Sequence, residues 1–269
     1  MQPSKKSTIT SEVDMHSWRH QSPDAWGFHT VISPDTCDST VSYVFRLNLA
    51  SRDSHTLISG KLEMAVTLIQ GEANLSGNAD LPQAMKRFDS FYIPADTEVV
   101  ITASTDCVFY IGGAQYAGIG KTSFRTYDEK LPIGDIHQIH GSGAGQREVM
   151  FTLDPETPAS RLICGLTWSG DGGWTSWPPH QHEKDLEEVY CYFDMPTLKQ
   201  GFHLSYLESG ALEDAVFHEV SSGTMVEAPR GYHPTVATPG TKNAYMWILV
   251  AFTPESRRYD LAKNDPAFA

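Results

Sequence analysis

The apolar residues of this chain recur in short runs, several of which alternate with a period of two, the pattern of β-strands. From Val41 to Leu49, every odd-numbered position is apolar. Further runs at 64–70, 90–93, 98–102 and 108–111 are bounded by turn-forming residues such as Gly71 and Pro94. No segment shows convincing helical periodicity over more than ten residues. The pattern predicts an all-β protein built as an antiparallel sandwich or barrel.

The second half of the chain repeats this rhythm. Its candidate strands are 148–153, 161–167, 187–193, 201–207, 215–220, 223–228 and 245–252. The segments SFYIPADTEVVI (90–101) and TMVEAPRGYHPTV (224–236) each read as a strand, a proline, a short turn and a returning strand. This weak internal similarity suggests a duplicated β-barrel. We therefore predict an N-terminal arm over 1–27, a first barrel over 28–125 and a second barrel over 126–269.

Composition narrows the classes of function. The 33 acidic residues exceed the 20 basic ones, and a net charge of −13 disfavours binding to nucleic acid. The longest apolar run, Tyr245–Phe252, is too short to span a membrane. The N-terminus lacks the apolar segment of a secretory signal, and the four cysteines form no Cys-x-x-Cys pair. These features lead us to expect a cytoplasmic protein.

The stretch from Gly172 to Phe193 carries the strongest chemical signal. His180 and His182 are two residues apart, so on a strand both imidazoles face the same side. Glu187 and Glu188 follow after a polar turn, and His233 in APRGYHP offers a third imidazole. Three histidines and one carboxylate, with positions left open for substrate, are typical of a catalytic site for a divalent ion such as Zn, Mn, Fe or Ni.

Alternation along 187–193 decides between the two glutamates. One face carries Glu187 with Val189, Cys191 and Phe193, and the other carries Glu188 with Tyr190 and Tyr192. The first face suits packing between sheets, so we favour Glu188 as the ligand, with Glu187 as the alternative. A lone His-x-His is more often structural than metal-binding, and only the added glutamate and His233 change that balance. His203 could line the same pocket. The other histidines lack partners at metal spacing and are interpreted as solvated or capping: His16, His20, His29, His55, His137, His140 and His218.

The same residues resemble a known family. PPHQHEKDLEEVYCYF followed by PRGYHP resembles the IolB family of 5-deoxy-glucuronate isomerases within the cupin superfamily, and YCYFDMP also resembles the sister KduI family, 5-dehydro-4-deoxy-D-glucuronate isomerases of pectin breakdown. The resemblance implies a bicupin, two jelly-roll (double-stranded β-helix) barrels, with metal only in the second. It implies His180, His182, Glu188 and His233 as the metal ligands. The short loop after His182 is closer to KduI, whereas RGYHP favours IolB.

Both families interconvert an aldose and a ketose that carry a carboxylate, so the resemblance implies an intramolecular oxidoreductase of inositol or pectin catabolism. A proton must then move between adjacent carbons, which requires a general acid and base. The catalytic candidates are Glu187, Tyr192, His203 and Tyr206. The candidates for substrate binding are Arg230, Arg161, Lys199, Tyr190 and Trp174. A non-catalytic sugar-binding cupin and a metal-dependent dioxygenase are the alternatives, and a homo-oligomer is plausible.

Overall fold

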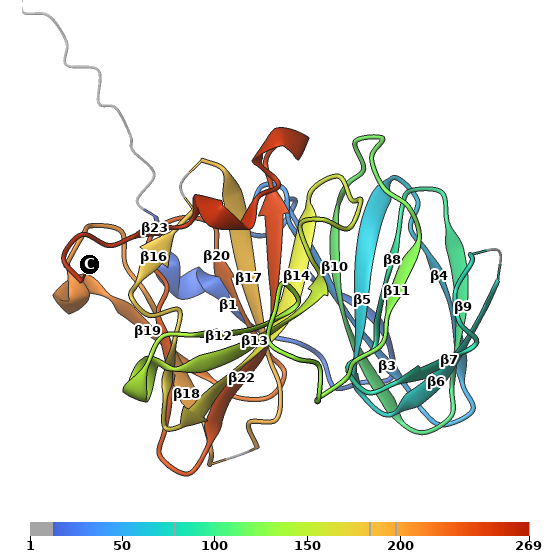
Figure 1. The fold of residues 1–269 in the computed structure, drawn as a ribbon, viewed down its shortest axis with the longest axis horizontal. Helices are drawn as coiled ribbons and strands as arrows, with labels where there is room; N and C mark the ends of the chain where they lie inside the picture. The colour runs from blue at the N-terminus through green and yellow to red at the C-terminus, as the bar shows by residue number, and fades with distance from the viewer. Residues whose placement is uncertain (1–12, 78, 183, 197, 269) are drawn as a thin grey trace, which may run out of the picture.

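The alternating segments form two β-barrels that lie side by side along the long axis of the molecule (Figure 1). The computed structural model describes residues 13–77, 79–182, 184–196 and 198–268. Every strand pair in it is antiparallel. No helix of the described residues is long and apolar enough to cross a membrane.

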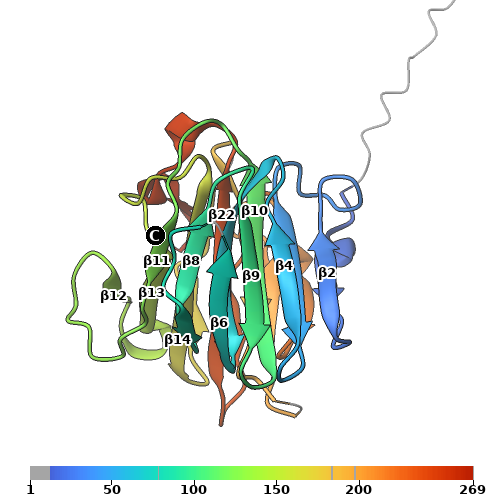
Figure 2. The same ribbon diagram turned by 90° about the vertical axis from the view of Figure 1, so that its right-hand side faces the viewer.

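The first barrel has a large and a small sheet. The large sheet has the order β11 (Ser123–Arg125), β8 (Ser90–Ile93), β5 (Leu62–Gln70), β10 (Cys107–Gln115), β3 (Tyr43–Leu49) and β2 (Gly27–Ile32). The small sheet has the order β4 (Ser54–Ile58), β9 (Glu98–Ala103), β6 (Glu72–Gly77) and β7 (Ala84–Lys86), and its strands cross the outer face of this barrel (Figure 2).

The second barrel repeats the plan. Its large sheet has the order β1 (Arg19–Gln21), β20 (Thr224–Ala228), β17 (Leu186–Tyr192), β22 (Lys242–Ala251), β14 (Leu162–Asp171), β13 (Arg147–Leu153) and β12 (His137–His140). Its small sheet has the order β15 (Trp174–Thr175), β21 (Thr235–Ala237), β18 (Gly201–Ser205) and β19 (Val216–Val220). A separate pair joins β16 (His180–Gln181) to β23 (Lys263–Asn264).

Helices are short among the described residues. They are the 3-10 turns η1 (Met15–Trp18), η2 (Gly143–Gly145), η3 (Leu212–Asp214), η4 (Pro254–Ser256) and η5 (Tyr259–Leu261). The strand order β8-β5-β10-β3 recurs as β20-β17-β22-β14, so the prediction of an all-β, duplicated barrel is confirmed. The two segments compared in the sequence, 90–101 and 224–236, begin with strands at matching places in this order, β8 and β20.

The large sheets are buried on both faces because each covers its own barrel and also packs against the other large sheet. One apolar cluster, which includes Val66, fills the first barrel, and another, which includes Trp247, fills the second. A third cluster joins residues of both barrels, among them Ala65 and Ile248. A Cβ added at Gly112 would lie 2.8 Å from Ile248 Cγ2, so this close approach requires glycine. Burial on both faces explains why several strands read as continuous apolar runs rather than clean alternations.

A buried carboxylate joins each barrel to the other. Glu63, the second residue of β5, is fully buried and accepts hydrogen bonds from Tyr92 Oη and from three backbone N–H groups at the start of β14. These three groups belong to Ser160, Arg161 and Leu162, at 2.6–3.0 Å. A carboxylate of the first barrel therefore holds the chain where it enters the second.

Glu187, the second residue of β17, makes the reciprocal contact. Its Oε1 accepts from the backbone N–H of Thr40 (2.6 Å) and from Thr40 Oγ1 (2.7 Å). Its Oε2 accepts from Val41 N–H (3.1 Å) and Ser42 Oγ (2.9 Å), just before β3 begins. The duplication has thus produced two equivalent clamps, Glu63 and Glu187, that lock the barrels together.

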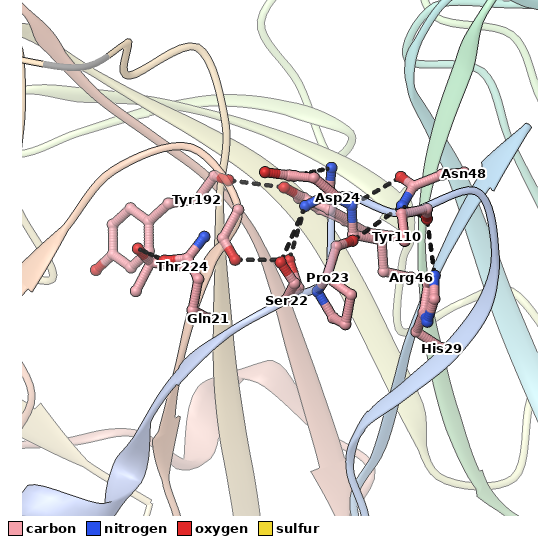
Figure 3. Close-up of polar contacts among 12 residues, drawn as sticks. Gln21, Ser22, Pro23, Asp24, His29, Arg46, Asn48, Tyr110, Tyr192 and Thr224 are labelled. Atoms are coloured by element: carbon pink, nitrogen blue, oxygen red, sulfur yellow. Dashed lines mark hydrogen bonds and ion pairs between the residues drawn. The ribbon is translucent and has the colours of Figure 1, made fainter. Parts of the chain in front are cut away.

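The N-terminal segment bridges the same interface. Strand β1 pairs with β20 of the second barrel, while the chain that follows is bound to β3 of the first (Figure 3). Arg46 Nη1 donates to Ser22 Oγ (3.0 Å), Arg46 Nη2 lies 2.7 Å from Asp24 Oδ1, and Asn48 Nδ2 donates to Pro23 O (2.9 Å). The described part of the predicted arm is therefore docked, and residues 1–12 lie outside the described residues.

His218, on β19 near this segment, was predicted to be solvated or capping but is buried. It is 3% exposed, and its Nε2 has no hydrogen-bond partner among the described residues. Burial, followed by the nearby His16, Arg19 and His20, lowers its pKa to about 4. The folded protein therefore keeps this imidazole neutral where the unfolded chain would protonate it.

We expect His218 to make the protein less stable in acid. Because its pKa is lowered from 6.5 to about 4 on folding, its contribution is present above pH 6.5 and is lost as the pH falls toward 4. The loss should reach about 3 kcal/mol of unfolding free energy. Urea denaturation of the wild type and of His218→Leu between pH 7.5 and 4 measures it. The difference in unfolding free energy between the wild type and His218→Leu should change over this pH range. If the two proteins lose stability in parallel as the pH falls, the lowered pKa of His218 is wrong.

Candidate metal centre and its cavity

Four side chains from three segments converge in the second barrel. His180 lies on β16, His182 follows in the next turn, and Glu188 projects from β17. His233 follows β20 after a turn at Gly231, which has a φ of +77°. A Cβ added at Gly231 would lie 2.5 Å from the Tyr206 carbonyl oxygen, so only glycine fits this turn. The local chain geometry therefore delivers His233 to the group that the sequence predicted.

The donor atoms of the four residues lie within 4.8 Å of one another. Both His182 Nε2 and His233 Nε2 are 3.0 Å from Glu188 Oε2. His233 Nδ1 lies 3.1 Å from the Gly231 carbonyl, to which it donates, so Nε2 carries the free lone pair. The contact of His233 Nε2 with Glu188 lacks hydrogen-bond geometry, and this buried nitrogen has no other partner among the described residues.

Burial sets the charges of the cluster. His182, Glu188 and His233 are buried, and His180 is partly buried. Burial, then the neighbouring His233 and His182, lowers the pKa of His180 well below its ordinary value. Burial alone would raise the pKa of Glu188, but its contacts with His182 and His233 reverse this, and the net pKa is lowered. At neutral pH, the site thus presents an anionic carboxylate and a neutral His180, the forms that bind a cation.

These donors fit a divalent metal ion. Neighbouring ligands bound at about 2.1 Å around one ion lie about 3.0–3.4 Å apart, and the two imidazole–carboxylate distances of 3.0 Å agree with this. The free lone pair of His233 Nε2 is a second sign, because a buried nitrogen without a partner is costly. Three imidazoles and a carboxylate suit zinc, manganese, iron or nickel, and the donor set does not select among them.

The cluster opens into a cavity of about 200 Å³ inside the second barrel. Its walls include Val149, Tyr190, Tyr245 and Trp247 from the large sheet. The C-terminal segment covers it, since Tyr259, Ala262 and Asn264 also line the cavity and β23 pairs directly with β16. The site is thus a pocket in a barrel, closed on one side by the end of the chain.

Three of the predicted catalytic residues pack around the cavity without lining it. Tyr192 Oη bonds to His203 Nδ1 and to Thr235 Oγ1, both at 2.9 Å, and all three are buried. Tyr206 Oη donates to Asp265 Oδ2 (2.9 Å), which fastens the C-terminal segment. Other side chains form the cavity walls, and the catalytic role of these three residues stays a prediction.

The prediction of Glu187 as a catalytic residue is wrong. It projects from the opposite face of β17, and both of its carboxylate oxygens accept hydrogen bonds from residues 40–42. A carboxylate saturated by four donors at the interface between the barrels cannot reach the substrate. The alternation that favoured Glu188 over Glu187 as the ligand agrees with this placement.

The cations predicted to bind substrate lie elsewhere. Arg230 is half exposed, and its Nη2 is 3.9 Å from Asp38 Oδ2. Arg161 Nη1 donates to the carbonyl oxygen of Phe252 at 2.6 Å. Lys199 lines a separate hollow with Asp171 and Asp194. None of the three side chains is among those that line the cavity, and their role in substrate binding stays a prediction.

The two aromatic predictions have different outcomes. Tyr190 lines the cavity, and its hydroxyl is 2.7 Å from Ser176 Oγ. Trp174 instead packs against Trp177, with ring centroids 5.0 Å apart, and is absent from the cavity walls. Tyr190 therefore lies where substrate would bind, whereas the role of Trp174 in substrate binding stays a prediction.

The sequence pattern did not indicate two of the residues that line the cavity. Arg147, at the start of β13, and His140, its cross-strand partner on β12, both line the cavity. The predicted strand began at 148, one residue too late. Extended by one residue, its alternation places Arg147 on the same face as Val149 and Phe151, which pack inside the barrel.

A second group of potential ligands, His20, Cys37 and Glu227, lies outside this cavity. His20 Nε2 is 2.6 Å from Glu227 Oε1, and Glu227 Oε2 accepts from Ser39 N–H at 2.8 Å. Both carboxylate oxygens are thus already bound. We interpret this group as a hydrogen-bonded structural pair beside a cysteine.

Comparisons with known proteins agree with this architecture. The profile of the KduI/IolB family matches residues 18–269. The 5-deoxy-glucuronate isomerase of Bacillus subtilis is 27% identical over 262 residues, covering 90% of this chain and 92% of that protein. The enzyme of the same name from Geobacillus kaustophilus is 28% identical over 207 residues, covering 70% of this chain and 71% of that protein. The crystal structure of an IolB-like protein from Salmonella typhimurium superimposes with a TM-score of 0.79 at 21% identity, covering 94% and 98%, and confirms the bicupin fold.

Proposed function

Because the chain belongs to the KduI/IolB family and is an enzyme of the aldose–ketose isomerase class, we propose that it converts 5-deoxy-glucuronate to 2-deoxy-5-keto-gluconate. This activity would place it in inositol catabolism. The relatives named 5-deoxy-glucuronate isomerase, which extend over most of the chain, support this substrate. The observation that carries the proposal is the cluster of three imidazoles and one carboxylate in a barrel cavity.

We propose that His180, His182, Glu188 and His233 hold one divalent ion. Such an ion polarises a sugar carbonyl and lowers the pKa of the adjacent hydroxyl, which helps a proton to move between the two carbons. The protein supplies the rest: the cavity shields the reacting carbons from bulk water, and Tyr190 offers a hydroxyl beside the cluster. The ring centroids of Tyr190 and His233 are 5.7 Å apart.

Tyr190 is suited to donate a hydrogen bond to a substrate oxygen. Burial, followed by the charge of Glu188, raises its pKa well above 10, so the hydroxyl keeps its proton at neutral pH. Ser176 Oγ, 2.7 Å away, orients this hydroxyl. A donor aimed at an oxygen that gains negative charge during the reaction stabilises the transition state.

Removal of the Tyr190 hydroxyl should slow the reaction. We expect Tyr190→Phe to lower kcat roughly 100-fold, because one donor to a developing oxyanion is lost. Its metal content should match that of the wild type. Tyr192→Phe is the matched control, since Tyr192 lies two residues along the same strand but outside the cavity walls. Equal kcat values for Tyr190→Phe and the wild type would remove Tyr190 from the mechanism.

Two substrates test the proposed function. The purified protein, supplied with divalent metal, is incubated with 5-deoxy-glucuronate or with 5-dehydro-4-deoxy-D-glucuronate, and product formation is followed by NMR. We expect turnover of the first. Turnover of only the second would assign the protein to the pectin pathway, and binding without turnover of either would indicate a non-catalytic cupin.

A further inference from the structure

Arg147 lines the cavity but has no role in the function proposed above. It is the one lysine or arginine among the described residues that line the cavity. Its partner across the β12–β13 pair is His140, which lines the same end. The metal-binding cluster, the hydroxyl of Tyr190 and a guanidinium therefore share a single small cavity.

The protein holds Arg147 in place without neutralising it. Its Nη1 donates to the Trp177 carbonyl oxygen (2.9 Å) and contacts the Gly145 carbonyl oxygen (3.5 Å) in the preceding turn. A Cβ added at Gly141 would lie 3.4 Å from this Nη1 and only 2.3 Å from the Gly145 carbonyl oxygen, so the glycine-rich turn fits closely around the side chain. Within the described ranges, no carboxylate lies within 4.0 Å of the guanidinium, and its Nε and Nη2 have no hydrogen-bond partner.

The guanidinium of Arg147 lines the same cavity as His180 and His182 of the cluster. Arg147 also lowers the pKa of His140, where burial has the larger effect. An oriented guanidinium with free N–H donors inside a cavity can bind an anion. Its planar N–H groups can form two parallel hydrogen bonds with a carboxylate.

We propose that Arg147 binds the carboxylate of the sugar-acid substrate and so makes the enzyme specific for acids over neutral sugars. The inference rests on the proposed function, because it takes the carbonyl end of the substrate to lie at the metal-binding cluster. With the carboxylate at Arg147 and the carbonyl at the cluster, both ends of a short-chain sugar acid are held in one cavity. Neutral aldoses of the same length lack the group that Arg147 binds.

Equilibrium binding of two non-isomerising probes tests this role. D-Gluconate carries a carboxylate but no carbonyl, and D-gluconamide is its neutral counterpart. By calorimetry, the wild-type protein with its bound metal should bind gluconate roughly 10- to 100-fold more tightly than gluconamide, the range for a charge-assisted pair. Arg147→Gln should bind both probes equally, and Arg147→Lys should keep only part of the preference. Arg230→Gln, which alters a half-exposed arginine outside the cavity, should retain the full preference.

Steady-state kinetics give a second readout. Arg147→Gln should raise the KM for 5-deoxy-glucuronate more than it lowers kcat, with metal content unchanged. If Arg147→Gln still prefers gluconate, or if the wild type shows no preference, the proposal is wrong. If the wild type binds gluconate through Arg147 yet fails to turn over 5-deoxy-glucuronate, then the proposed substrate is wrong and the carboxylate site stands.

Discussion

Replacement of His233 by alanine is expected to reduce isomerase activity by at least about 1,000-fold and to release the bound metal ion. His233 supplies a nitrogen 3.0 Å from Glu188 Oε2, with its other nitrogen bound to the Gly231 carbonyl oxygen. Without it, two imidazoles and one carboxylate remain, and the loss of one of four ligands weakens the binding of the ion. Metal content by elemental analysis and initial rates by NMR measure both effects.

His218→Leu is the matched control, because it removes a buried histidine of the same barrel that lies outside the cluster. It should keep both metal and activity at neutral pH. Thermal unfolding provides a further check. Added metal should raise the Tm of the wild type and of His218→Leu but not that of His233→Ala, since an ion stabilises only the fold that binds it. Wild-type metal content in His233→Ala would contradict the assigned ligand set.

Loss of either interface clamp is expected to cause the largest change in stability. Glu187→Gln keeps the shape of the side chain but turns an NH₂ group toward donors of residues 40–42, so at least one buried donor loses its acceptor. We expect a loss of about 2–4 kcal/mol in the free energy of unfolding. Glu63→Gln should lose a similar amount of stability, because the carboxylate oxygens of Glu63 also accept hydrogen bonds from donors only.

Chemical denaturation with a constant m-value measures these losses. Glu72→Gln, on an exposed position of β6, is the control and should stay within about 0.5 kcal/mol of the wild type. The clamps share no partner, so the double variant should lose nearly the sum of the two single losses. A Glu187→Gln protein as stable as the wild type would show that the clamp does not hold the barrels together.

The convergence of His180, His182, Glu188 and His233 was predictable because each of its signals is local. The spacing of His180 and His182 and the face of Glu188 follow from the two-residue period of a strand, and His233 follows a Pro-Gly turn. The strand pattern likewise predicted the duplicated all-β fold. Local periodicity fixes the face of Glu188 on β17, and the two-residue spacing of His180 and His182 keeps their imidazoles together.

The remaining predictions depended on contacts between distant segments. Glu187 meets Thr40, which is 147 residues away in sequence, and no local pattern indicates that pairing. Arg230 was chosen because it is near His233 in sequence, yet its side chain lies near Asp38 instead. Arg147 was missed because the predicted strand began one residue after it. Alternation assigns a face, but it does not say which segment covers that face.

Turnover by metal-free and reloaded protein is the most direct test of the central claim that His180, His182, Glu188 and His233 hold a catalytic ion. The wild type is stripped with chelator, and its conversion of 5-deoxy-glucuronate is followed by NMR before and after reloading with zinc, manganese, iron or nickel. We expect no turnover after stripping, and recovery with one ion bound per chain. Full turnover by protein shown to contain no metal would contradict it.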